Sequence, residues 1–117
     1  MVEPLPRPKA KQLVTKGSAL AAYINAEWTH NPFEIEAVAP FGSYMSQEDE
    51  LAELDLGIVV RPRTDARRSR WRRMTTKLDG ANEIRTAFRG LSSFVHVQMV
   101  KDRQLLPRPF AVVFQEG

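Results

Sequence analysis

The sequence predicts a small α/β protein of the α+β kind, with a mixed β-sheet and helices packed on one face. The chain has 117 residues, 43% of them hydrophobic, which is enough for one compact core. Segments with apolar residues at helical spacing and segments with apolar-polar alternation follow one another in the order helix, strand, strand, helix, strand, strand. That order is typical of a single mixed sheet covered by helices.

Residues 9–28 are predicted to form the first helix. Apolar side chains recur there at helical spacing, at Leu13, Leu20, Ile24 and Trp28. The residues before it include three prolines, which disfavour a helix. We therefore expect residues 1–8 to be a flexible N-terminal arm and residues 9–117 to be a single domain.

Two strands are predicted next, separated by a turn and an acidic segment. After a loop at residues 30–32, residues 34–39 form a short alternating strand that runs into Pro40–Ser43. Residues 53–60 alternate more regularly, and Pro62 ends them.

A second helix is predicted after that strand. Trp71, Met74 and Leu78 would form its apolar stripe, it would begin after Thr64 or Asp65, and it would stop near Asp79-Gly80.

The last part of the chain predicts a short helix and two strands. Residues 82–89 form the helix, with Ile84 and Phe88 on one face. Residues 94–100 are rich in β-branched residues and are expected to form a strand. Residues 110–114 are expected to form an edge strand, with a helix of one or two turns as the alternative.

Charge is divided between two neighbouring segments. Five acidic residues and no basic residue lie between Tyr44 and Leu56, and seven arginines with one acid lie between Arg61 and Arg73. These segments either form two solvated faces or build a site where a metal cation and phosphates meet. The arginines also leave open a nucleic-acid-binding protein that uses a basic helix over Arg61–Arg73.

The acidic strand carries residues suited to metal chemistry. Glu53 and Asp55 are two residues apart, so on a strand both carboxylates project to the same face. Carboxylate oxygens are ligands for Mg²⁺, which in phosphoryl-transfer sites bridges to substrate phosphates. Gly42 allows phosphate to approach the backbone after the first strand, and Ser43 adds a hydroxyl and an N–H. Arg61 and Arg63 are predicted to hold the outer phosphates.

The Gly-Ser pair, a gap of nine residues and the sequence Glu53-Leu54-Asp55-Leu56 resemble the signature of the polymerase-beta-like nucleotidyltransferases, especially their small stand-alone bacterial members. The resemblance implies a nucleotidyltransferase-like fold and a phosphate-binding role for Gly42 and Ser43. It also implies that Glu53 and Asp55 bind Mg²⁺. The family commonly has a third acid on a later strand, where this chain has His96 and Gln98, so His96 is the candidate general base.

The predicted function is binding of Mg²⁺ and a nucleoside triphosphate, with ATP as the first candidate, and transfer of a nucleoside monophosphate to an acceptor hydroxyl. A catalytically degenerate nucleotide-binding or regulatory module is the alternative within the same fold. The small size suggests that a partner protein or a second copy completes the site. The absence of cysteine and of any long apolar run predicts a cytoplasmic protein without a membrane span.

Overall fold

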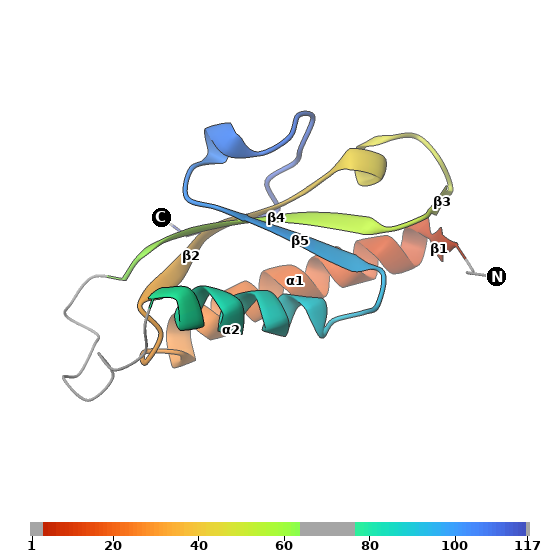
Figure 1. Cartoon of the computed structure of the whole chain (residues 1–117). Helices are drawn as coiled ribbons and strands as arrows, with labels where there is room; N and C mark the ends of the chain where they lie inside the picture. Colours follow the sequence, from red (N-terminus) through yellow and green to blue (C-terminus); the bar gives the residue numbers. More distant parts are fainter. Residues whose placement is uncertain (1–3, 64–76, 117) are drawn as a thin grey trace.

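The computed structural model (Figure 1) describes residues 4–63 and 77–116. The predicted basic helix lies mostly outside these residues, including Trp71 and Met74 of its apolar stripe. Within the described residues, no helix has the length and apolar character needed to cross a membrane.

The main sheet has four strands in the order β5-β4-β2-β6. They are β2 (Phe33–Phe41), β4 (Leu54–Pro62), β5 (Val95–Val100) and β6 (Phe114–Gln115). β5 runs parallel to β4, whereas the pairs β2-β4 and β2-β6 are antiparallel. The mixed α+β architecture predicted from the sequence is therefore confirmed.

Two helices, α1 (Arg7–Glu27) and α2 (Lys77–Arg89), lie on the same side of this sheet (Figure 1). Alternate residues of β4 point toward them, as the pleat of a strand requires, and in β2 a register shift between Ile35 and Ala37 places both Ile35 and Val38 on this face. The resulting core contains Leu13 and Ile24 of α1, Ile84 and Phe88 of α2, Ile35 and Val38 of β2, and Leu56 and Ile58 of β4.

The opposite face of the sheet carries a smaller apolar cluster. Ala37, Ala39 and Val59 are buried there beneath Leu106, which follows the short helix η4 (Arg103–Leu105). Asp55 is four residues from Val59 on β4, and His96 is four residues from Val100 on β5, which packs against this cluster. Because successive side chains of a strand point to opposite faces, Asp55 and His96 lie on the same face of the sheet as the cluster. The predicted site therefore lies on the face away from the helices.

Leu5 to Pro8, expected in a flexible arm, instead belong to the folded protein. Leu5 is 2% exposed and lies in β1 (Leu5–Pro6), which pairs with β3 (Glu50–Leu51). Pro6 is the N-cap of α1 and Pro8 lies in its first turn, where a missing N–H breaks no helical hydrogen bond. Pro6 and Pro8 thus lie at the start of the helix.

Arg7 attaches the start of α1 to the acidic segment. Its guanidinium donates hydrogen bonds to the carbonyl oxygens of Tyr44, Ser46 and Glu48. This segment follows the short helix η1 (Gly42–Met45) and leads to β4, so the bonds fix the connection between the two halves of the predicted motif.

α2 continues through Gly80, where the sequence predicts a helix stop. A Cβ on Gly80 would lie 2.7 Å from Pro32 Cδ and 2.8 Å from Asn31 Oδ1, so the glycine allows close contact with the loop before β2. The buried Asn31 side chain also donates to the Gly80 carbonyl at 2.9 Å. Here the glycine serves packing and not helix termination.

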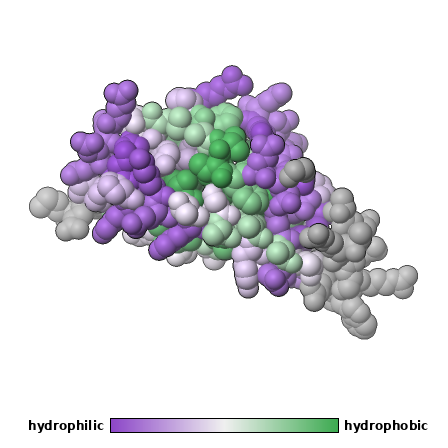
Figure 2. Space-filling model, turned by 180° about the vertical axis from the view of Figure 1, so that it is seen from behind, coloured by the Kyte–Doolittle hydropathy of each residue, from purple (hydrophilic) through white to green (hydrophobic). Residues whose placement is uncertain are grey.

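The C-terminal segment runs along β2, at the edge where the sequence predicts a strand. Val113 N–H donates to the Val38 carbonyl at 2.9 Å, although the paired strand β6 is short and begins at Phe114. The space-filling view from behind (Figure 2) shows a hydrophobic area flanked by hydrophilic side chains. The exposed large hydrophobic side chains of the described residues are Tyr23, Leu105, Val112 and Val113.

Candidate metal and phosphate site

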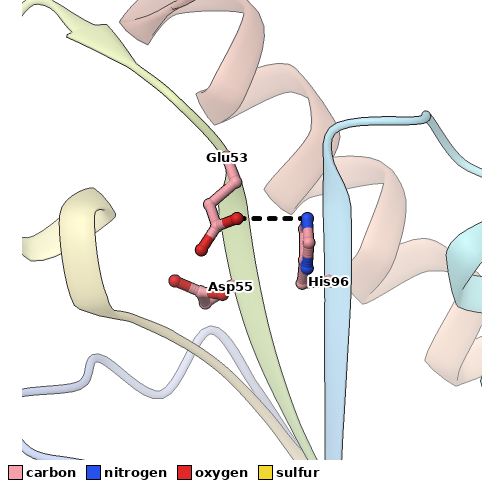
Figure 3. A group of neighbouring side chains, drawn as sticks. All are labelled: Glu53, Asp55 and His96. Atoms are coloured by element: carbon pink, nitrogen blue, oxygen red, sulfur yellow. Dashed lines mark ion pairs between the residues drawn. The ribbon is translucent and has the colours of Figure 1, made fainter.

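Two neighbouring parallel strands bring the acidic pair and the histidine together. Glu53 directly precedes β4, Asp55 is its second residue, and Asp55 is in register with His96 of β5. Their potential ligand atoms all lie within 4.8 Å of one another. Figure 3 shows the three side chains gathered on one side of the two strands. We call Glu53, Asp55 and His96 the triad; it has the composition and spacing of a group that could hold a metal ion.

The triad is open to solvent on one side. His96 Nε2 lies 3.1 Å from Glu53 Oε2, with side-chain exposures of 59% for the histidine and 44% for the glutamate. Asp55 is half-buried, as Glu53 is, whereas His96 is exposed. The exposed parts of these side chains allow a ligand to approach.

Burial and the neighbouring carboxylate both act on Asp55. Partial burial raises the pKa of the Asp55 carboxyl above its ordinary value, the negative charge of Glu53 raises this pKa further, and His96 lowers it. A hydrogen bond between the two carboxyl groups also favours the protonated form. The ionised pair is thus electrostatically unfavourable without a cation, which is the condition that a bound divalent ion relieves.

Gly42 packs closely against Asp55. Its φ of 66° lies in the left-handed region, which glycine adopts without the steric cost that other residues have. A Cβ on Gly42 would lie 2.7 Å from Asp55 Oδ2. No other residue type fits this turn without displacing the carboxylate, so the turn and the triad are structurally linked.

Ser43 lies at the same turn and holds the start of the acidic strand. Its hydroxyl donates to the backbone carbonyl of Glu53 at 3.0 Å. The hydroxyl proton is therefore engaged in positioning Glu53, which the sequence did not indicate. A direct contact between Ser43 and phosphate stays a prediction.

The structure does not bring Arg61 and Arg63 to the triad. Arg61 is six residues beyond Asp55 on β4, about 20 Å along a strand, and its guanidinium pairs with Glu34 at 3.0 Å. Arg63 is 5% exposed and donates to the carbonyls of Ile24, Asn25 and Asn31 near the end of α1. Both arginines stabilise the fold at the far end of β4, so the expectation that they hold phosphates at this site is wrong.

These placements also affect the nucleic-acid-binding alternative. Two of its seven arginines, Arg61 and Arg63, have partners within the protein. The other five lie outside the described residues, and the alternative stays a prediction for them.

A third carboxylate does not join the triad from the described part of the chain. Asp102, the nearest acid after β5, is six residues past His96 and accepts a hydrogen bond from Gln104 N–H at the start of η4. His96 itself occupies the position beside Asp55. The candidate ligands are therefore two carboxylates and one imidazole.

A cavity of about 310 Å³ adjoins His96 on the outer side of β5. Arg85 and Arg89 of α2 and Ser93 of the following loop contribute to its lining. The local sequence patterns did not indicate a role for these residues. The sequence feature that could have indicated them is the four-residue spacing of Arg85 and Arg89, which places both on one face of the helix predicted before the strand of His96.

Comparisons of the chain with family models, with curated proteins and with solved structures returned no match.

Proposed function

We propose that this protein binds a nucleoside triphosphate together with Mg²⁺ at the triad, in the manner of the polymerase-beta-like nucleotidyltransferases that its sequence resembles. The observation that carries this proposal is the convergence of Glu53, Asp55 and His96 within 4.8 Å, next to a glycine turn that packs closely against Asp55. ATP is the first candidate for the nucleotide.

The donor set suits Mg²⁺ through the two carboxylates. Mg²⁺ prefers oxygen ligands, keeps several waters and commonly binds through one or two carboxylates plus substrate phosphates. A bound Mg²⁺ would neutralise negative charge on the phosphates at this position. The left-handed turn at Gly42 brings the backbone close to Asp55, since a Cβ there would lie 2.7 Å from Asp55 Oδ2.

His96 gives this site a feature that depends on the metal. Imidazole is a good ligand for Zn²⁺ and other transition metals, whereas Mg²⁺ favours oxygen. With Mg²⁺, His96 stays outside the metal's ligands and its ring remains available for proton transfer. With Zn²⁺, we expect the ring to become a ligand.

The placement of His96 favours a second candidate function, nucleotidyl transfer itself. When the Nε2–H of the neutral ring donates to Glu53 Oε2, Nδ1 is the free acceptor. It would take the proton of an acceptor hydroxyl while that oxygen bonds to the α-phosphorus and the bond to pyrophosphate breaks. The acceptor and any partner protein that presents it stay predictions.

The first experiment measures ATP affinity by calorimetry with Mg²⁺ and again with excess EDTA. We expect binding that depends on Mg²⁺ and that weakens about tenfold or more in Asp55→Asn, because the variant loses a charged metal ligand. Glu48→Gln is the matched control, since it removes an exposed acid from the same segment but not from the triad. Equal affinities in both variants would contradict the proposal.

A second experiment separates nucleotide binding from transfer. Pyrophosphate release from ATP is measured over a panel of hydroxyl-bearing acceptors for the wild type and for His96→Asn. Release that is lost in the variant with ATP affinity retained supports transfer. Intact ATP affinity without release by the wild type supports the regulatory module instead.

A further inference from the structure

The cavity beside His96 lies between the last turns of α2 and the outer edge of β5. Its lining consists of Arg85, Arg89, Ser93, Val95, His96 and Val97. The volume of about 310 Å³ is at the lower end of the range for small-molecule sites, about 300–1,000 Å³. We call this cavity the arginine pocket.

Both arginines of the pocket line the same cavity. Arg85 and Arg89 are four residues apart on α2, so their side chains lie on one face of the helix. None of the described residues that line the pocket is acidic. The pocket therefore concentrates positive charge beside β5.

The side chains of these arginines are less engaged than those of Arg61, Arg63 and Arg103. Arg61 and Arg103 pair with carboxylates, and Arg63 is held by backbone carbonyls. The Arg85 side chain has only a 3.4 Å hydrogen bond to the Asn82 side chain, and within the described residues the Arg89 side chain makes no hydrogen bond or ion pair. Their guanidinium groups are available to a ligand.

The remaining polar groups of the pocket can also donate hydrogen bonds. Ser93 lines the pocket and carries a hydroxyl that can donate a hydrogen bond. β5 is an edge strand of the described sheet, so every second residue directs its backbone N–H away from β4. Several convergent donors around two guanidinium groups match the oxygens of a phosphate, which arginine binds with two parallel hydrogen bonds.

We propose that the arginine pocket binds the terminal phosphates of the nucleoside triphosphate whose metal is held by the triad. This inference rests on the proposed function, and His96 connects the two, because it belongs to the triad and also lines the pocket. Arg85 and Arg89 thus take the role that the sequence analysis gave to Arg61 and Arg63.

The test measures binding of inorganic tripolyphosphate in excess EDTA, so that the metal site does not contribute. The double variant Arg85→Gln, Arg89→Gln is compared with the wild type by calorimetry. We expect the affinity of the double variant to fall at least about tenfold, because two charged hydrogen-bond donors are lost. Arg108→Gln removes the same charge from another exposed position and should leave the affinity unchanged.

Two further variants keep the outcome decisive. Arg89→Lys retains the charge without the planar guanidinium and should give an intermediate loss even if the double variant is poorly folded. Because tripolyphosphate binding in EDTA involves no metal, its loss in the double variant reports on the pocket, whereas the loss of Mg²⁺-dependent ATP binding in Asp55→Asn reports on the proposed function.

The arginine pocket is rejected if the wild type does not bind tripolyphosphate, or if the double variant binds it as tightly as Arg108→Gln does. The same double variant should also weaken ATP binding in the presence of Mg²⁺. Unchanged ATP affinity there, with weaker tripolyphosphate binding in EDTA, would overturn the assignment of the pocket to the nucleotide.

Discussion

Replacing Gly42 by alanine tests the link between the turn and the triad. The change adds one methyl group at a residue with a φ of 66°. For a residue other than glycine this conformation costs about 1–2 kcal/mol. The new Cβ would lie 2.7 Å from Asp55 Oδ2, so the carboxylate must rotate away from its preferred position at a further cost of about 0.5–1 kcal/mol.

The expected loss in the free energy of unfolding is therefore about 1.5–3 kcal/mol. Unfolding entropy near 2.1 cal/mol/K per residue gives about 0.25 kcal/mol/K for this chain, so Tm should fall by about 6–12 °C. Mn²⁺ affinity should also fall by about tenfold, because the Asp55 carboxylate is displaced from the triad. Thermal unfolding followed by circular dichroism and Mn²⁺ calorimetry measure the two effects.

Gly17→Ala is the matched control for this substitution. Gly17 lies inside α1, and a Cβ there would make ordinary contacts, with Leu56 Cδ1 at 3.7 Å as the nearest. Alanine should stabilise the helix by about 0.5–1 kcal/mol and leave Mn²⁺ affinity unchanged. If Gly42→Ala is as stable as the wild type and binds Mn²⁺ equally well, the structural link between Gly42 and Asp55 is refuted.

Three other substitutions test stability at defined positions. Asp55→Asn should be more stable than the wild type at neutral pH by about 1 kcal/mol, the repulsion of two carboxylates near 5 Å in water. Because the pKa of Asp55 is raised in the folded state, the wild-type carboxylate becomes protonated as the pH falls through that raised pKa toward 3.8, and the stability advantage of the variant should disappear. Urea unfolding of both proteins at several pH values measures this, and a stability difference that stays constant or reverses sign would contradict the prediction. Arg63→Met should lower the free energy of unfolding by about 2–4 kcal/mol, because it leaves buried carbonyls unpaired. Arg61→Met should lower it by less than about 1 kcal/mol, because the ion pair is partly exposed. Equal urea midpoints of the two variants would refute this contrast. Gly80→Ala should lower Tm although alanine favours helices, because its Cβ would meet Pro32; a raised Tm would show that the loop before β2 yields.

Much of the fold and part of the site follow from local sequence patterns. The alternation over residues 53–60 predicted β4 and placed Glu53 and Asp55 on one face. The spacing of Ile84 and Phe88 predicted the buried face of α2. These features depend on periodicity along one segment, so a single sequence contains them.

Other features depend on which segments meet, and the sequence alone did not indicate these. Arg63 belongs to a run of arginines that predicts a solvated or phosphate-binding helix, yet it is buried against the end of α1. The parallel register of β4 and β5 places His96 beside Asp55, and the packing of α2 against β5 creates the arginine pocket. Long-range register and helix packing determine these contacts, and local spacing does not specify them.

Direct measurement of Mn²⁺ binding tests the central claim, that the triad holds a divalent cation. Mn²⁺ accepts the oxygen ligands that Mg²⁺ uses and also imidazole, and its binding can be followed by electron paramagnetic resonance without any nucleotide. We predict one Mn²⁺ per chain, with affinity reduced about tenfold or more in Asp55→Asn and unchanged in Glu48→Gln. No binding by the wild type, or equal affinity in the two variants, would contradict the claim.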